Sequence, residues 1–564
     1  MKGGTELTDF SSAFRDFASS VLRPEPAELR NCRMLTEEEI AQLERSGSFS
    51  QDWSTVLITP ETRLDLVSGC LFQGRVLVHL PDGKLRCTMI RDCKILGPLN
   101  VESTGIVSGL TLFQGCSVSF CGRVEWTSAP SFLWSSIQGG LETGERSLPL
   151  LPNLTHTDAA WLASGNGRRE AHKLSEMLLE LKEKLTGFIG EDAHLTSCPA
   201  LENSIFLKGS LVNGATAVRG SVLFPGSSVT DGALVRSSVL QWNAKADSLA
   251  VVQDSIVGEC SVVEKHGKLT SSYLGADSVL AEGEITASVV GPLTGMHHQS
   301  LLIAAFWPGG KGNIGYGANI GSNHTSRLPD QEIRPGTGLF FGLSTSVKFP
   351  SDFSRSPFSV IATGLTTLPQ RVEFPFSLIC LPEVRPQGVP EGWMRLIPGW
   401  MLHSNLYAVL RNLWKFRSRS RSVHTAVDTG IFSQEILELV REALSDLESS
   451  SGCTAEGAGK NFITPEDRLA GIVVYRKCLR FFSLRDKLEE GSISTGEAGE
   501  LIDLLKQIRQ GVRLSREKDF KRGARIIHDY RTIHPGPEED PFMIAFEDRL
   551  KKMEGEVSPL GCIS

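Results

Sequence analysis

Eight polar residues between positions 319 and 348 have side chains that could bind a substrate and move a proton. They begin within a segment of small and aliphatic residues, GGKGNIGYGANIG at 309–321, in which glycine recurs. Imidazole titrates near neutral pH, so His324 is the candidate general base. The candidate substrate-binding residues are Asn319, Asn323, Arg327, Asp330, Glu332, Arg334 and Lys348.

The residue types around His324 suggest three supporting roles. The two asparagines could orient the imidazole or hydrogen-bond a substrate, and the two arginines and the lysine could hold a phosphate or carboxylate. Asp330 or Glu332 could fix the tautomer of the ring. The alternative interpretation is a hydrogen-bonded turn that closes a regular scaffold, because Asn, Thr, Asp and Pro are common turn residues.

His297 and His298 form a second candidate site. Adjacent residues of an extended strand face opposite ways, so the two rings would not line one site. A metal site built from these two histidines and His324 would lack any recognisable ligand spacing. The sequence therefore predicts no metal site, and it predicts no covalently bound cofactor.

A repeat provides the scaffold for these residues. Residues 205–239 divide into sixes: IFLKGS, LVNGAT, AVRGSV, LFPGSS, VTDGAL and VRSSV. An aliphatic residue begins each six, glycine recurs at the fourth place and a small residue at the fifth. This pattern predicts short strands that turn at glycine, with Leu211, Leu223, Val229 and Val235 pointing inward in one stacked column.

The repeat resembles the hexapeptide repeat of left-handed parallel β-helices. Weaker copies at 89–117, 256–280 and 314–320 extend it over much of 85–125 and 203–375. The resemblance implies a mainly β, left-handed parallel β-helix. It also implies acyl transfer from acyl-CoA or acyl-carrier protein, with a histidine near the coil edge as base.

Four longer blocks resemble a family of uncharacterised bacterial β-helix proteins. They are GANIGSNHTSRLPDQE (317–332), FFGLSTSVKFPSDFS (340–354), ATGLTTLPQRVEFPFSLI (362–379) and PGWMLHSNLYAVLRNLWK (398–415). The first hundred residues lack the glycine-rich signature of sugar-nucleotide pyrophosphorylases, so we expect no nucleotidyltransferase domain.

Helical patterns interrupt and follow the repeat. Leu174, Met177, Leu178, Leu181 and Leu185 follow helical spacing, and further helices are expected near 432–449, 466–490, 496–517 and 539–553. The predicted organisation is an N-terminal segment (1–84), a first β-helix part (85–157), a helical insertion (158–202), the main β-helix (203–384) and a C-terminal α-helical domain (385–564).

Composition narrows the partners and the compartment. The formal net charge of −7 argues against a nucleic-acid partner, and no apolar run approaches the length of a membrane helix. The N-terminus MKGGTELTDF has no secretory pattern, and the cysteines include no C-x-x-C pair, so we expect free thiols in the cytoplasm. The resemblance to hexapeptide β-helices implies a homo-oligomer, with a trimer favoured, and exposed aliphatic faces would give the physical motive. The C-terminal helical region could instead cover those faces and leave a monomer or dimer.

The sequence thus favours a transferase that moves an acyl group from a CoA-type thioester, its co-substrate, to a sugar or sugar nucleotide. The alternative is a non-catalytic β-helix scaffold that binds a sugar nucleotide or a protein partner.

Overall fold

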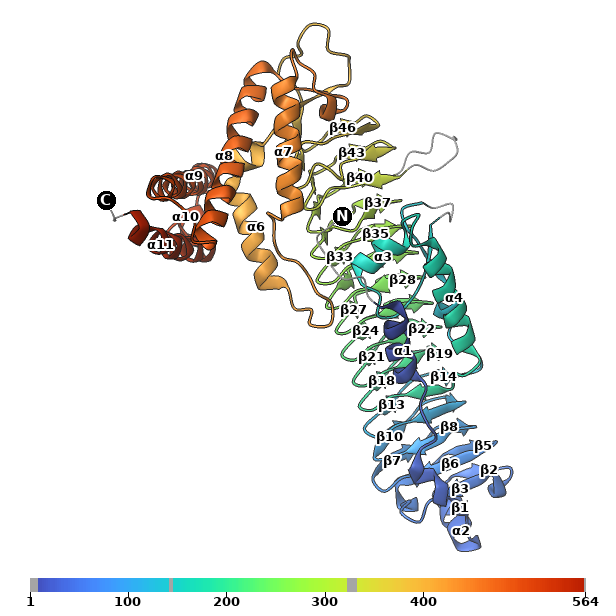
Figure 1. Ribbon diagram of the computed structural model, residues 1–564. Helices are drawn as coiled ribbons and strands as arrows, with labels where there is room; N and C mark the ends of the chain where they lie inside the picture. Colours follow the sequence, from blue (N-terminus) through green and yellow to red (C-terminus); the bar gives the residue numbers. More distant parts are fainter. Residues whose placement is uncertain (1–8, 142–145, 322–331, 562–564) are drawn as a thin grey trace. The chain divides into compact units, whose positions relative to one another are not determined.

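The computed structural model describes residues 9–141, 146–321 and 332–561. The chain is a β-solenoid of about 18 turns with parallel sheets, followed by helices near the C-terminus (Figure 1). This confirms the predicted class, mainly β with an inserted helix and a C-terminal helical region. The first of its two compact units comprises Met1–Gly310, Asn319–Ile333 and Arg421–Val427, and the second comprises Lys311–Ala318, Arg334–Ser420 and Asp428–Ser564.

Three sheets form the solenoid of the first unit, and each coil gives one short strand to each sheet. The first sheet contains β1 (Arg33–Met34), β3 (Val56–Ile58), β6 (Val76–His79), β9 (Lys94–Leu96), β12 (Leu110–Leu112), β17 (Gly187–Ile189), β20 (Ile205–Phe206), β23 (Val222–Leu223), β26 (Val239–Leu240), β29 (Ile256–Val257), β32 (Tyr273–Leu274), β35 (Val289–Val290) and β38 (Phe306–Trp307). The second contains β2 (Phe49–Ser50), β5 (Leu71–Gln73), β8 (Met89–Arg91), β11 (Ile106–Ser108), β14 (Arg123–Glu125), β19 (Ala200–Glu202), β22 (Ala217–Arg219), β25 (Leu234–Arg236), β28 (Val251–Gln253), β31 (Lys268–Thr270), β34 (Glu284–Thr286), β37 (Leu301–Ile303) and β40 (Asn319–Ile320). The third contains β4 (Val67–Ser68), β7 (Gly83–Arg86), β10 (Leu99–Glu102), β13 (Ser117–Ser119), β18 (His194–Thr196), β21 (Leu211–Asn213), β24 (Ser228–Thr230), β27 (Lys245–Ala246), β30 (Val262–Glu264), β33 (Val279–Ala281) and β36 (Gly295–Met296).

The strand register corrects the predicted column. Val212 pairs with Val229, and Val229 pairs with Ala246, so residues 17 apart stack on one another. Successive sixes instead occupy successive sheets: Leu223 lies in the first sheet and Val235 in the second. Leu211 is 39% exposed, whereas its neighbour Val212 is fully buried. The predicted column is wrong for two reasons: three successive sixes form one coil, so their first residues lie in three different sheets, and a coil of 17 residues is one short of three sixes, so Val212 and not Leu211 stacks on Val229.

Glycine at the turns was predicted correctly. Gly214, Gly220, Gly226 and Gly232 all adopt positive φ, between 57° and 77°. This left-handed conformation favours a residue without a Cβ atom, so the recurring glycines mark the places where the chain turns from one sheet to the next.

A ladder of buried serines runs along one corner of the solenoid. Its members, 16 or 17 residues apart, are Ser204, Ser221, Ser238, Ser255, Ser272 and Ser288. Each hydroxyl accepts a hydrogen bond at 3.0–3.1 Å from the backbone N–H of the next corner along the chain. Each also donates to the carbonyl two residues before it, at 2.6–2.9 Å. The ladder thereby satisfies backbone groups that the turn removes from the sheets.

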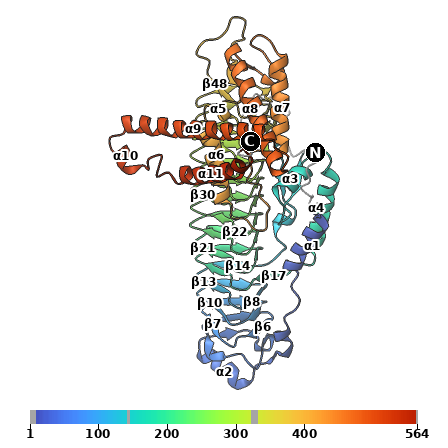
Figure 2. The same cartoon turned by 60° about the vertical axis from the view of Figure 1, so that its left-hand side comes forward.

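An insertion between β14 and β17 covers the outer face of the first sheet. It contains the hairpin β15 (Ser136–Gln138) and β16 (Ser147–Pro149), then α3 (His156–Leu162) and α4 (Arg168–Lys182). Helices α3 and α4, together with α1 (Phe10–Val21), run alongside the strands in both views (Figures 1 and 2). One apolar cluster joins the helices to Ile205, Val222, Val239, Ile256, Tyr273 and Val289 of the sheet.

The structure moves two predicted boundaries. Parallel pairing already joins β2 to β5 and β3 to β6, so the solenoid begins well before residue 85. Residues 187–202, assigned to the helical insertion, form β17, β18 and β19 and belong to the coils. The leucine pattern of 174–185 predicted the helix correctly, because Leu174, Leu178 and Leu181 are its buried face.

The second unit combines further coils with a helical bundle. Its strands are β39 (Asn313–Ile314), β42 (Phe340–Phe341), β43 (Ser346–Val347), β44 (Ser351–Asp352), β45 (Val360–Ile361), β46 (Thr366–Thr367), β47 (Gln370–Arg371), β48 (Leu378–Cys380), β49 (Met394–Ile397) and β50 (Asn461–Phe462); β41 (Ile333–Arg334) lies at the boundary. Its helices are α5 (Trp400–His403), α6 (Leu406–Arg419), α7 (Gln434–Ser449), α8 (Pro465–Glu489), α9 (Thr495–Ile526), α10 (Tyr530–Ile533) and α11 (Pro541–Gly561). A further helix, α2 (Glu37–Arg45), belongs to the first unit. Among the described helices, none combines the length and apolar character of a membrane span.

Candidate functional site

The centre of the predicted polar site lies outside the described residues. This holds for His324, Asn323, Arg327 and Asp330, which all fall within 322–331. Their roles therefore stay predictions, as does the general-base role of the imidazole.

The remaining four predicted site residues are divided between the two units. Asn319 is exposed on β40, and Glu332 bonds to Arg146 near the start of β16, a partner that the sequence did not suggest. Arg334 accepts at its carbonyl from the backbone N–H of Phe353 (2.8 Å) in the second unit. Lys348 has an exposed side chain, and its backbone N–H donates to Thr367 (3.2 Å).

The histidine pair has ordinary surface contacts. The Nδ1 atom of His298 lies 2.9 Å from a carboxylate oxygen of Glu282, and this ion pair is exposed to solvent. Within the described ranges, no three His, Cys, Asp or Glu side chains are placed to hold a metal ion.

A strap of the chain is held against the solenoid of the first unit by two carboxylates. The strap is Arg421–Val427, and Glu259 accepts from the backbone N–H groups of Val423, His424 and Thr425 at 2.8–3.2 Å. Asp277, one coil further, accepts from the N–H of Arg421 (3.0 Å) and the Ser422 hydroxyl (2.8 Å).

The hydrogen bonds from the strap favour the ionised form of Glu259. Burial by itself raises the pKa of this carboxyl, but the hydrogen bonds from Val423, His424 and Thr425 outweigh that effect and hold the pKa below its ordinary value. The imidazole of His424 lies 3.0 Å from the same carboxylate and stacks on Trp242, with ring centroids 4.2 Å apart. Both carboxylate oxygens of Glu259 thus have hydrogen-bond partners in the strap, so we interpret this cluster as structural.

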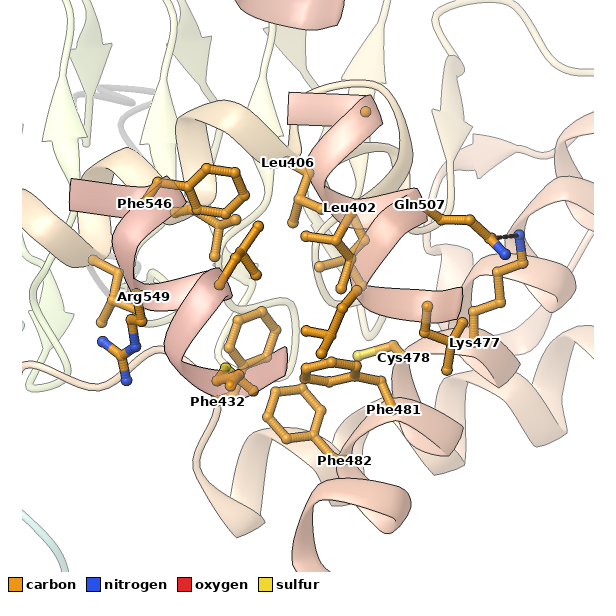
Figure 3. Close-up of a pocket in the computed structure, with 18 of the residues that line it drawn as sticks. Leu402, Leu406, Phe432, Lys477, Cys478, Phe481, Phe482, Gln507, Phe546 and Arg549 are labelled. Carbon is orange, nitrogen blue, oxygen red and sulfur yellow. Dashed lines mark hydrogen bonds between the residues drawn. The ribbon is translucent and has the colours of Figure 1, made fainter. Parts of the chain in front are cut away.

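The helical part of the second unit contains an apolar cavity of about 480 Å³ that is partly open to solvent. On α6, the lining residues Leu406, Leu410, Leu413 and Arg417 recur at helical spacing, so one face of this helix forms a wall. Side chains of α5, α8, α9 and α11, together with Phe432, complete the lining. Figure 3 shows leucine and phenylalanine side chains from several helices converging on the space.

Polar groups occur at the edges of the cavity. Lys477 donates to the side chain of Gln507 (3.2 Å) on one side, and Arg549 lies on the other (Figure 3). Arg417 and His403 also belong to the lining. The cavity therefore has an apolar interior with cationic groups at its margin, which is a common composition for a small-molecule site.

The one thiol among the lining residues is chemically inert. Burial raises the pKa of Cys478 to about 12, so the group is a neutral thiol at physiological pH. A thiol, unlike a thiolate, is a poor nucleophile and behaves as a small apolar group. The lining thus favours binding over covalent chemistry.

Sequence analysis missed this cavity as a site. Its first wall lies in PGWMLHSNLYAVLRNLWK, which stood out only as a family likeness. The available signal was the spacing of Leu406, Leu410 and Leu413 beside aromatics, but such a stripe is equally typical of a filled core. Only the packing of distant helices distinguishes a cavity from a core.

Comparison with known proteins gives a family without an assigned activity. Residues 135–425 match a family described as "Domain of unknown function (DUF4954)". A protein of Treponema pallidum (strain Nichols), named "Uncharacterized protein", is 29% identical over 188 residues, which are 33% of this chain and 25% of the relative. The aligned region thus spans about a quarter of the relative's length.

Proposed function

The chain belongs to the DUF4954 family of domains of unknown function, and we propose that it is a binding scaffold: a β-solenoid with a helical region whose cavity holds an apolar small molecule. The cavity carries this proposal. Its volume of about 480 Å³ falls within the roughly 300–1,000 Å³ of known ligand sites.

The chemistry of the lining supports a binding role. Leu406 of α6, Phe546 of α11 and Phe432, which precedes α7, offer apolar contact from different parts of the chain. An apolar ligand that displaced water from this surface would gain roughly 25 cal/mol for each Å² buried. The protonated Cys478 adds no nucleophile at physiological pH.

Filling the cavity tests the proposal. Gly511 lies on α9 among the lining residues, and a Cβ atom built there meets no other atom within 4 Å. Gly511→Leu should therefore place a side chain in the space without a backbone clash. We expect the variant to bind the neutral fluorophore N-phenyl-1-naphthylamine at least about tenfold more weakly than the parent, as measured by fluorescence titration.

Gly499→Leu is the matched control. Gly499 lies on the same helix, is equally free of close contacts and is not a lining residue. Both substitutions exchange glycine for a better helix former, so only the position relative to the cavity differs. The proposed function fails if the parent does not bind the fluorophore, or if both variants bind it as the parent does.

Acyl transfer from a CoA-type thioester to a sugar or sugar nucleotide stays a prediction of the repeat resemblance. Its proposed base, His324, lies outside the described residues. Release of free CoA in the presence of nucleotide sugars, compared between the parent and His324→Gln, tests it independently of the cavity. A loss of roughly 10²–10⁴-fold in turnover would support general-base catalysis.

The predicted trimer also stays a prediction. The insertion and α1 cover the outer face of the first sheet of the solenoid, so this apolar face is already buried within the chain. Light scattering of the full chain measures the oligomeric state.

A further inference from the structure

The cavity margin carries positive charge that nearby acidic groups do not neutralise. Arg417 lies in the last turn of α6 and Arg549 on α11, and both are lining residues. Among the ion pairs of the described residues, neither guanidinium has a carboxylate partner. The lining face therefore presents two arginines that are available to a ligand.

Two of the four acidic residues of α11 form ion pairs with another helix. Glu547 and Glu554 bind Arg509 of α9 at 3.0 and 2.8 Å. Helix α6 has the sequence LYAVLRNLWKFRSR, which contains four basic residues and no acidic one. The α6 C-terminus supplies only about half an elementary negative charge, which is too little to balance this helix.

The positive groups act on one another. Burial, and then the charge of Arg417, lower the pKa of Arg549 from its ordinary value. Burial, followed by Arg411 and Arg419, likewise lowers the pKa of Lys415 on α6, to about 8. An anion bound by Arg417 and Arg549 would relieve the repulsion between these two guanidinium groups.

The opposite side of the cavity differs. There the Lys477 ammonium already donates to Gln507 (3.2 Å) (Figure 3). The two sides therefore differ: the Lys477 ammonium has a hydrogen-bond partner within the chain, whereas the guanidinium groups of Arg417 and Arg549 have no ion-pair partner among the described residues.

We propose that the ligand is a single-chain amphiphile whose alkyl chain fills the apolar cavity and whose anionic head group binds Arg417 and Arg549. This inference rests on the proposed function. A carboxylate and a phosphate share the required chemistry, since guanidinium groups bind both through charge-assisted, often bidentate hydrogen bonds. An alcohol of equal chain length keeps the apolar contact and lacks the charge.

Three ten-carbon probes separate these features: decanoate, decyl phosphate and 1-decanol. Each is titrated into the full chain by calorimetry below its aggregation concentration. A hydrogen bond to a charged group contributes about 1.5–3 kcal/mol, so we expect at least one anion to bind about tenfold or more tightly than decanol. The preference should fall as salt is added, and the ratio between the two anions identifies a carboxylate or a phosphate ligand.

A double variant, Arg417→Gln with Arg549→Gln, should lose the anion preference and keep the affinity for decanol. Lys477→Gln removes one positive charge from the other side and should retain the preference. Circular dichroism establishes that each variant is folded.

The outcomes separate the two proposals. If decanol binds as tightly as both anions, or if the double variant keeps its preference for an anion, the head-group inference is wrong and the cavity remains a binding site. If neither these probes nor N-phenyl-1-naphthylamine bind, the proposed function is wrong as well, and the inference falls with it. The space would then be filled by side-chain rearrangement or by a partner protein.

Discussion

The serine corner of the solenoid and the cavity of the helical region differ in whether their polar groups have hydrogen-bond or ion-pair partners within the chain. Along the corner, each buried serine hydroxyl both donates and accepts, so polar atoms are paired within the chain. Around the cavity, the interior is apolar and the arginines at the margin lack acidic partners among the described residues.

The difference follows from how the two backbones satisfy their hydrogen bonds. A coil must turn every few residues, and each turn removes N–H and C=O groups from the sheets, so the sequence supplies a serine per coil. A helix satisfies its own backbone except at its ends, so side-chain packing between helices is free to leave space. Buried polar groups therefore stabilise the backbone of the solenoid, whereas the apolar space in the helical region is the feature on which we base the proposed ligand site.

The largest expected effect concerns the interior of the coils. Val229 is fully buried between Val212 and Ala246, so Val229→Asp should lower the free energy of unfolding by more than about 4 kcal/mol, because a charge there has no partner. Chemical denaturation measures the loss.

Leu211→Asp is the control for that variant. Its side chain is exposed, so the change should stay within about 0.5 kcal/mol. Equal losses from the two aspartates would contradict the 17-residue register, in which Val212 and not Leu211 faces the interior.

The serine ladder should show a smaller loss. Ser238→Ala removes the acceptor for the N–H of Ser255 (3.1 Å) and leaves that group buried without a partner. We expect the free energy of unfolding to fall by about 1–3 kcal/mol. Ser228→Ala, on the outer side of β24, should have an effect below about 0.5 kcal/mol; a similar loss from both would show that the ladder has no special role.

The strap Arg421–Val427 offers a local test of whether polar groups paired within the chain stabilise its structure. Glu259→Gln removes the charge that accepts from Val423, His424 and Thr425, so amide exchange of the strap should quicken about tenfold. Hydrogen-exchange mass spectrometry of the peptide containing 421–427 measures this rate. Glu284→Gln, which affects an exposed pair with Lys268, should leave it unchanged.

Acid should mimic that substitution. The pKa of Glu259 is lowered in the folded chain, so its contribution is fully present above the ordinary glutamate pKa and is lost as pH falls through the lower, folded value. Strap exchange, corrected for intrinsic rates, should accelerate in that acidic range in the parent and show no such transition in Glu259→Gln. A strap equally protected across this range would refute the anchoring role.

The smallest expected effect on stability is that of filling the cavity. Gly511→Leu and Gly499→Leu should each raise the free energy of unfolding by up to about 1 kcal/mol, because leucine favours helix over glycine. Thermal unfolding measures both. A marked destabilisation by Gly511→Leu alone would mean that the space at that position is already occupied.

The sequence by itself determined the repeating architecture and its interruptions. The recurring glycines at 214, 220, 226 and 232 predicted the turns, and the leucines of 174–181 predicted α4. Both features are predictable because turn conformation and helix amphipathicity depend on residues only a few positions apart in the sequence. The long C-terminal helices were predictable for the same reason, although α9 extends to Ile526 and so beyond the predicted end at 517.

Only the tertiary structure decided which residues stack, which carboxylates hold the strap and where space remains. The coil of 16 or 17 residues moved Leu211 to the surface, and Glu259 found partners more than 160 positions away. The cavity requires α5, α6, α8, α9 and α11 to pack imperfectly. That Glu547 and Glu554 of α11 bind Arg509, and form no ion pair with Arg417 or Arg549, is evident only in the folded chain. Space and charge balance are set by side chains distant in sequence, and no local motif records them.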